Sequence, residues 1–349
     1  MAFGRDLDEL MGAAHRGDVD ARFELGRRYA AGDGVARNDA ASVHWWSRAA
    51  EQGDLEAQFL LHFAWKLGRA PGVDEATAVS WLRRAAERGH AKAQSALGHV
   101  LRKSDAAVEA VQWWQRAAAQ GEARAMASLG FAHLRGVGAP QDDGAAMRWF
   151  RAAAERGHTE AQYRVGLMLS VPDESPLDAA GAIEWFRAAA AKGHLEATYF
   201  VAQALEFGRG VAIDVAEAAT YYRCAAELGH AGAQNNLATL CEAGHGVARD
   251  IDEAIRWYEK SAAQRNGAAE ENLGRIHVCR PGLDNLIRGF AWYCEAILDG
   301  QQSSVVRRDD VLAKVSPELR PLLESMQKKT ESGVRVVKVT RTLDSPADD

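Results

Sequence analysis

A glycine followed by a polar residue recurs along this chain at an almost constant interval. It occupies seven positions, separated by 36, 36, 32, 36, 36 and 36 residues: Gly17, Gly53, Gly89, Gly121, Gly157, Gly193 and Gly229. An eighth unit begins near Arg265, where the glycine is replaced while the apolar column continues from Leu237 to Leu273. A fixed period of this size is typical of proteins built from stacked repeats, because one unit cannot bury its apolar faces alone.

Each unit contains two segments with helical periodicity. In the first segment, apolar residues follow the spacing i, i+4 and i+8, as in Ala21, Leu25 and Tyr29, which places them on one stripe of a helix. The second segment carries an aromatic pair, such as Trp45 and Trp46, followed in most units by two alanines. Nine of the ten tryptophans lie in these pairs. We therefore expect the rings to pack against small residues and to form the core between helices.

This pattern predicts an all-α protein, a right-handed αα superhelical solenoid of about eight 36-residue helix-turn-helix repeats with C-terminal capping helices. The repeats occupy residues 1–299 and start near residues 14, 53, 89, 121, 157, 193, 229 and 265. Residues 300–330 are expected to form the capping helices, the second of which begins either after Ser316 as N-cap or at Pro321. Residues 331–349 are expected to be a disordered tail, with a strand that pairs with a partner's sheet edge as the alternative.

Composition limits the classes of function. No run approaches the roughly 18 consecutive apolar residues of a membrane span, and the N-terminal segment lacks the basic lead and apolar core of a secretory signal. The four cysteines form neither a CxxC pair nor a disulfide framework. The net charge of −6 comes from interspersed acids and bases, so no broad basic surface is predicted. We expect a cytoplasmic protein that binds neither nucleic acid nor membrane, and the oligomeric state stays open.

The repeat unit has the pattern D/H-x-E-A-Q-x-x-L-G, then G-x-G-V, then A-x-x-W-[WF]-x-R-A-A-x-x-G. This pattern resembles the Sel-one-like repeat family, whose units are related to the tetratricopeptide repeat, over about residues 14–299. The resemblance implies an adaptor, an assembly scaffold or a regulator that binds partner proteins or peptides. In a secreted branch of the family a cysteine pair staples each repeat, but those positions hold residues such as Ala226 and Gln234 here. The resemblance therefore does not extend to that branch or to the penicillin-binding activity ascribed to it.

No catalytic or cofactor-binding motif is present in the sequence. The Gly-x-Gly turns lack the third glycine and the preceding strand of a dinucleotide site. The sequence also contains no HExxH, GxxxxGK or GxSxG motif and no metal-spaced Cys/His cluster. We therefore predict no enzyme activity, no cofactor and no metal.

Most histidines occupy repeated structural positions. Four of them follow the repeat glycine at the entry to the first helix: His90, His158, His194 and His230. His133 and His277 fall in the core column of that helix. The simple interpretation of these two is a buried imidazole bonded to a carbonyl, and the alternative is a ligand-binding group.

One face of the first helices is the candidate binding surface. Positions two before and two after the core leucine lie about 160° from it and face away from the core. Aromatic residues there predict a groove on the concave face, continued toward the C-terminus by amides that could clamp an extended backbone. The predicted groove consists of Phe23, Phe59, Phe63, Phe131, Tyr163, Tyr199, Asn235, Asn236 and Asn272. The alternative is that superhelical curvature buries the rings against neighbouring first helices.

The sequence thus predicts a scaffold or adaptor that binds a protein or an extended peptide on its concave face. An inhibitor or immunity-type protein that wraps one enzyme or toxin is the second interpretation. A hydrolase is the third, and it requires acids or a nucleophile that converge in a pocket.

Overall fold

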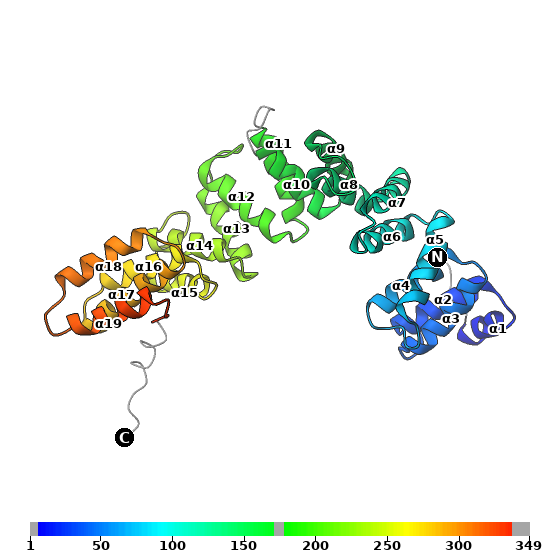
Figure 1. Ribbon diagram of the computed structural model, residues 1–349, viewed down its shortest axis with the longest axis horizontal. Coiled ribbons are helices and arrows are strands. Elements are labelled where there is room, and N and C mark those ends of the chain that lie inside the picture. The colour runs from blue at the N-terminus through cyan, green and yellow to red at the C-terminus, as the bar shows by residue number, and fades with distance from the viewer. Residues whose placement is uncertain (1–5, 171–177, 337–349) are drawn as a thin grey trace, which may run out of the picture. The chain divides into compact units, whose positions relative to one another are not determined.

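The computed structural model describes residues 6–170 and 178–336, which form nineteen α-helices and no strand (Figure 1). Eight helix pairs follow one another in the chain, with α1 (Leu7–His15) before them. The first helices of the pairs are α2 (Val19–Ala31), α4 (Leu55–Lys66), α6 (Ala91–Lys103), α8 (Ala123–Arg135), α10 (Thr159–Ser170), α12 (Leu195–Phe207), α14 (Ala231–Ala243) and α16 (Gly267–Val278). The second helices are α3 (Asp39–Glu51), α5 (Glu75–Glu87), α7 (Ala107–Ala119), α9 (Asp143–Glu155), α11 (Ala179–Ala190), α13 (Val215–Glu227), α15 (Ile251–Ala262) and α17 (Leu283–Leu298).

The chain folds as two compact units, residues 1–165 and 166–349, and the boundary falls within α10. In each unit a helix packs chiefly against the helices that precede and follow it in the chain. This nearest-neighbour packing is the arrangement of an α-solenoid. The predicted all-α repeat fold is therefore confirmed. Among the helices described, none combines the length and the apolar character that a bilayer-spanning segment needs.

The core column of the first helices is sealed from solvent. Its Leu or Val side chain is fully buried in all eight pairs: Leu25, Leu61, Leu97, Leu129, Val165, Val201, Leu237 and Leu273. In five of the pairs the next residue is a glycine that receives a ring of the second helix: Gly26, Gly98, Gly130, Gly166 and Gly274. A Cβ added at Gly130 would lie 2.6 Å from the buried ring of Phe150, and one at Gly274 would lie 2.6 Å from Tyr293. The rings therefore pack on glycines as well as on the predicted alanines, because a Cβ would keep them away.

The histidines at the entry to the first helices are N-caps. Nδ1 accepts a hydrogen bond from the backbone N–H three residues later, at 3.1, 3.2, 3.2 and 3.0 Å, in His90, His158, His194 and His230. Asp18 and Asp54 cap their helices in the same way with a carboxylate oxygen. These side chains satisfy backbone donors that have no partner inside the helix. Their repeated position is therefore structural, as the sequence indicated.

The two core-column histidines also have hydrogen-bond partners. Nδ1 of His133 lies 3.1 Å from the carbonyl oxygen of Pro140, and Nδ1 of His277 lies 3.3 Å from Oδ1 of Asn285. His277 is buried, while His133 is only half-buried. The carbonyl-bonded interpretation fits both rings, and the expectation of full burial is wrong for His133.

Two helices close the last pair, α18 (Ser303–Lys314) and α19 (Arg320–Glu331). Pro321 lies in the first turn of α19, where its missing N–H costs nothing. Of the two starts considered from the sequence, Pro321 is therefore the correct one and Ser316 lies before the helix.

The predicted start of the disordered tail, at residue 331, is too early. Val336 is fully buried in a cluster with residues of α17, α18 and α19. Arg335 bonds carboxylates of α17, so the chain is anchored for five residues beyond the end of α19. The remainder of the expected tail, residues 337–349, lies outside the described residues.

Candidate functional site

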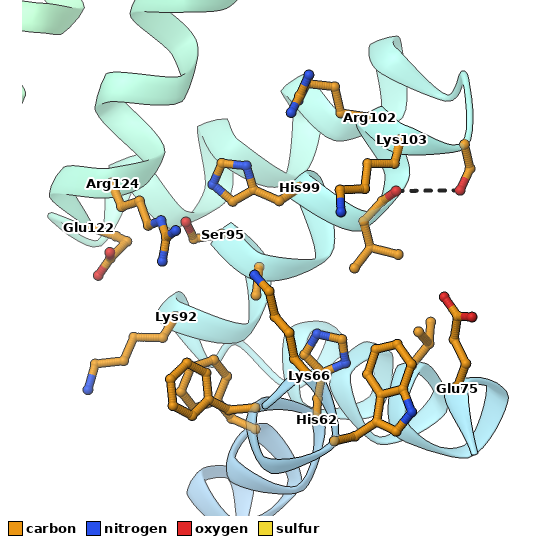
Figure 2. A pocket seen from close by; sticks show the side chains of 17 residues that line it. His62, Lys66, Glu75, Lys92, Ser95, His99, Arg102, Lys103, Glu122 and Arg124 are labelled. Carbon is orange, nitrogen blue, oxygen red and sulfur yellow. Dashed lines mark hydrogen bonds between the residues drawn. The ribbon is translucent and has the colours of Figure 1, made fainter. Parts of the chain in front are cut away.

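A pocket of the first unit is lined by α4, α5, α6, the residue before α8 and α8 itself (Figure 2). Its volume is about 590 Å³, within the range of about 300–1,000 Å³ that is common for ligand sites. Since α4, α6 and α8 are the first helices of three consecutive pairs, the pocket lies on the helices whose outward face the sequence singled out for partner binding.

Positive charge dominates the lining of this pocket. Its five cations are Lys66 of α4, Arg124 of α8 and three residues of α6, Lys92, Arg102 and Lys103. Two carboxylates, Glu75 and Glu122, also belong to the lining. Within residues 6–170 and 178–336, none of the five cations forms an ion pair. The pocket therefore presents positive charge that the described part of the chain does not neutralise.

The cations come from opposite sides of the pocket. Figure 2 shows Lys66 extending from α4 and Lys103 from α6 into the same space, with Arg124 beside Ser95. A ligand with more than one anionic group can contact several of these side chains. Such charge-assisted contacts are about twice as strong as hydrogen bonds between neutral groups.

The apolar part of the lining comes mainly from α4. Phe59 and Phe63 are one turn apart, and their rings stack with a centroid separation of 6.4 Å. The Phe59 ring also lies 5.3 Å from the ring of His90. Phe63 is 46% exposed, so its ring adds apolar surface to the lining.

Two buried polar atoms of lining residues have no hydrogen-bond partner among the described residues. They are Oγ of Ser95 and Nδ1 of His62, in side chains that are only 2% and 5% exposed. Nearly all buried polar groups in proteins are hydrogen-bonded. These two atoms are therefore buried polar groups that the described residues leave without a partner.

A third polar group, the His99 imidazole, is neutral at pH 7. Its ring lies 5.4 Å from that of Trp114, and Nε2 lies 3.4 Å from Oγ of Ser128. Burial, together with the positive charge of Arg124 and three other lining cations, lowers the pKa of His99 to about 4. Burial and the positive charge of Lys66 also lower the pKa of His62, the other imidazole of the pocket. Both rings can accept a proton when an anion offsets the local positive charge.

Ser95 and His99 do not form a nucleophile–base pair. Oγ of Ser95 has no hydrogen-bond partner among the described residues, and Ser128 donates its hydroxyl hydrogen to the carbonyl oxygen of Arg124 at 2.9 Å. Neither hydroxyl is therefore activated by the imidazole. In the described ranges, no group of three or more His, Cys, Asp or Glu side chains is arranged to hold a metal ion. The lining is thus suited to binding an anionic group with an apolar portion.

Of the predicted groove residues, the pocket brings together only Phe59 and Phe63. Phe23, one pair earlier, is half-buried and packs against the core cluster around Trp46 and Leu61. Phe23 therefore packs partly on the core, as the alternative for these rings supposed, and its part in partner binding stays a prediction.

Phe131 and Tyr163 are half-buried and do not line the pocket. The Phe131 ring lies edge-on to the buried ring of Phe150 at 5.0 Å. The guanidinium groups of Arg135 and Arg164 lie 5.5 and 5.2 Å from its centroid. Arg164 lies 5.5 Å from the Tyr163 ring as well. These two rings stabilise neighbouring arginines by cation–π contact.

In the second unit the predicted amides bond one another. Nδ2 of Asn272 donates to Oδ1 of Asn235, and Nδ2 of Asn235 donates to Oδ1 of Asn236, both at 3.2 Å. Nδ2 of Asn236 donates to the Tyr222 hydroxyl at 3.1 Å, and the ring of Tyr199 lies 5.9 Å from that of Tyr222. A peptide backbone bound here would have to compete with this chain of hydrogen bonds.

Two cations of the second unit, on α16 and on α18, have partners. Arg275 of α16 bonds both carboxylate oxygens of Glu242 at 2.7 Å. Arg307 of α18 lies 2.7 Å from Oε1 of Glu271. Because these charges are neutralised internally, the cationic pocket of the first unit is the stronger candidate for a ligand site.

Sequence reasoning did not identify the polar part of the pocket. Ser95 and His99 occupy the same two outward-facing columns as Phe59 and Phe63, but aromatic character was the criterion there. The cations of the lining lie near helix ends, outside those columns. Their only sequence signal is the adjacent pair Arg102 and Lys103 at the end of α6.

Comparison with protein families identifies the repeat. The model of the Sel1 repeat matches residues 19–54, 66–90, 91–122, 123–158, 159–194, 195–230 and 231–266. These segments cover more than half of the chain. None of the curated proteins compared with the chain matches it.

Solved structures with the same architecture are similar over most of the chain. A protective antigen of uropathogenic Escherichia coli strains that displays an SLR fold is 26% identical with a TM-score of 0.85, over 95% of this chain and 72% of that chain. A Sel1 repeat protein from Oxalobacter formigenes is 31% identical with a TM-score of 0.63, over 79% of this chain and 83% of that chain. Sel1 repeat proteins generally mediate protein–protein interactions. From its repeats, this chain belongs to the Sel1 repeat family.

Proposed function

We propose that this protein is a non-catalytic scaffold or adaptor that holds a partner polypeptide, and that the cationic pocket of the first unit is a binding site for it. The single observation that carries the proposal is the set of five cations in one pocket without an ion pair among the described residues. Like charges that are left unpaired repel one another and destabilise the folded state. Their position around the apolar side chains Phe59 and Phe63 therefore favours a role in recognising a partner.

Two further features support binding rather than catalysis. The aromatic side chains Phe59 and Phe63 supply the apolar area on which binding energy usually concentrates. The hydroxyl of Ser95 lacks the general base that acyl transfer would require.

We further propose the cytoplasm as the location, because all four cysteines are free thiols.

The test compares proteins captured by two variants with the same change in charge. Lys66→Glu/Lys103→Glu reverses two cations of the pocket. Arg148→Glu/Arg151→Glu reverses two exposed arginines on α9, which do not line the pocket. Each variant and the wild-type chain are immobilised, exposed to lysate of the native cell and analysed by quantitative mass spectrometry.

We expect the pocket variant to lose at least one specific partner that the wild-type chain and the α9 variant both retain. Circular dichroism of both variants establishes that the helices are intact. Equal capture by the three proteins would show that the pocket is not a partner-binding site.

A further inference from the structure

We infer that the ligand of the cationic pocket is an acidic peptide segment that carries one large apolar side chain between its carboxylates. The inference rests on the proposed function and names the chemistry of the partner at the same site. Three properties of the lining carry it. They are the cations without an ion pair among the described residues, the positions of Glu75 and Glu122, and the stacked rings of Phe59 and Phe63 beside two buried polar atoms.

Charge complementarity requires a ligand with more than one negative charge. Lys66, Lys103 and Arg124 extend from three different helices toward the same space (Figure 2). A single carboxylate can contact only some of them, whereas two or three carboxylates along a peptide can each find a cation. Desolvated pairs of this kind determine which partners an interface accepts.

The two acids of the lining discriminate against a continuous polyanion. Figure 2 shows Glu122 and Glu75 at opposite ends of the pocket, with Lys66, Lys103 and Arg124 between them. A nucleic-acid strand carries a phosphate at every residue and would bring negative charge against both carboxylates. A peptide can place its acids in the middle and neutral residues at each end. The arrangement therefore favours a peptide.

The apolar side of the pocket selects the central residue of that peptide. Phe63 is 46% exposed beside the half-buried Phe59, so their stacked rings offer a surface for one aromatic or large aliphatic side chain. Oγ of Ser95 and Nδ1 of His62 are the polar atoms without partners nearby. Both atoms are covered in the free protein, so a bond to the peptide backbone requires rotation of these two side chains.

His99 couples this binding to pH. The charged and polar groups that surround it come from α4, α6, α7, α8 and the residue before α8: Lys66, Arg102, Lys103, Trp114, Glu122, Arg124 and Ser128. In the free protein burial and the cations lower the pKa of His99 to about 4. Carboxylates in the pocket oppose the cations and raise that pKa, so binding takes up a proton. Affinity should therefore rise as the pH falls from 7.5 toward 5.5, a range in which acidic peptide side chains stay ionised.

The direct experiment measures binding of fluorescent peptides by anisotropy. The probe is a synthetic peptide with the sequence Gly-Asp-Glu-Phe-Asp-Glu-Gly. Its controls replace the four acids by Asn and Gln, replace them by Lys, or replace Phe by Ala. We expect the neutral and the basic peptides to bind at least tenfold more weakly, and the Ala peptide about fivefold more weakly, because aromatic anchors contribute strongly to interfaces.

Variants of the protein locate the site. Lys66→Glu/Lys103→Glu should lower the affinity for the acidic peptide at least tenfold, while Arg148→Glu/Arg151→Glu should change that affinity less than twofold. The wild-type affinity should rise severalfold between pH 7.5 and 5.5, and His99→Gln should reduce this dependence on pH. Thermal unfolding shows that each variant is folded.

Three outcomes would overturn the inference. They are equal affinity for acidic and neutral peptides, equal weakening by the two charge reversals, and displacement of the peptide by an equimolar oligouridylate of matched length. If peptide binding fails while protein capture still depends on Lys66 and Lys103, the scaffold function stands and its ligand has another chemistry. If both fail, the pocket is not the binding site.

Discussion

His90 donates a hydrogen bond from Nε2 to Oε2 of Glu56 at 2.8 Å and thereby joins the first helices of two consecutive pairs. Because Nδ1 of His90 accepts from the backbone N–H of Ala93, the ring is the neutral tautomer with its hydrogen on Nε2. One side chain thus caps α6 and bridges to α4. In the second unit His230 and Glu196 repeat the arrangement at 3.3 Å.

Replacing His90 should separate these two contributions. We expect His90→Ala to lower the free energy of unfolding by about 1–2 kcal/mol, because it removes both the cap and the bridge. His90→Asn keeps an acceptor for the cap and should recover about half of that loss. Urea unfolding followed by circular dichroism measures both. An Ala variant within about 0.3 kcal/mol of wild type would contradict the capping role.

The contact between Gly130 and Phe150 predicts the opposite of the usual effect of replacing a helical glycine. Alanine normally stabilises a helix interior relative to glycine by about 0.5–1 kcal/mol. A Cβ at Gly130 would lie 2.6 Å from the fully buried Phe150 ring, so Gly130→Ala should instead destabilise by about 1–3 kcal/mol.

Gly144 provides the matched control for this substitution. It lies exposed in the first turn of the neighbouring helix α9, and the nearest atom to an added Cβ is 3.3 Å away, on the side chain of Asp142. Gly144→Ala should therefore be neutral or slightly stabilising. Thermal unfolding of the two variants in parallel gives the comparison. Equal stabilisation by both would show that the ring does not need the glycine.

The repeat fold could be predicted because every unit carries the same periodic signals. The spacing of Leu25, Leu61 and their equivalents determines the buried stripe, and the aromatic pairs determine which helices face each other. The glycine that contacts a ring in five of the pairs was visible in the repeated Leu-Gly, but its role depends on how closely the helices approach. The anchor at Arg335 and Val336 could not be predicted, because it depends on contacts with α17 about 40 residues earlier.

The candidate site was only half predictable for a related reason. Helical geometry placed Phe59 and Phe63 outside the core, and the structure brings both into one pocket. The same geometry also placed Phe23 outside the core, although this half-buried ring packs against the cluster around Trp46 and Leu61. Among the described residues Lys66 and Arg124 have no ion pair, which depends on side chains of several helices and is encoded by no column of the repeat.

Arg335 anchors the chain after α19, and its removal should destabilise the second unit. It donates to Oε2 of Glu295 at 2.7 Å and to Oδ1 of Asp299 at 2.6 Å, two side chains that are almost fully buried. Arg335→Ala leaves these carboxylates without that donor, so we expect a loss of about 1–3 kcal/mol in the free energy of unfolding.

The control for Arg335 is an exposed cation of the same unit. Lys314 is 73% exposed in its pair with Asp310, so Lys314→Ala should cost less than about 0.5 kcal/mol. Hydrogen exchange of α17 peptides, followed by mass spectrometry, should show faster exchange only in Arg335→Ala. Equal exchange in the two variants would show that the arginine does not anchor this segment.

The same cluster makes the stability of the second unit depend on pH through Glu270. This side chain is 1% exposed, and its Oε2 has no hydrogen-bond partner among the described residues. Burial and the nearby charge of Asp299 raise the pKa of Glu270 to about 8. The unfolded chain has the ordinary pKa of about 4.3. The folded state therefore keeps a proton that the unfolded state releases, and this contribution to stability is complete below about pH 4.3 and is lost as the pH rises through 8.

We expect the free energy of unfolding to fall between pH 5.5 and pH 8.5 in the wild-type chain, and to fall less in Glu270→Gln, which keeps the shape of the protonated acid without its charge. Because deprotonation places a second negative charge beside Asp299, the variant should be the more stable protein at pH 8.5. Glu324→Gln, at an exposed position on α19, should follow the wild-type curve. Urea unfolding at pH 5.5, 7 and 8.5, with hydrogen exchange of the α16 and α17 peptides, tests the prediction, and parallel curves for wild type and Glu270→Gln would refute it.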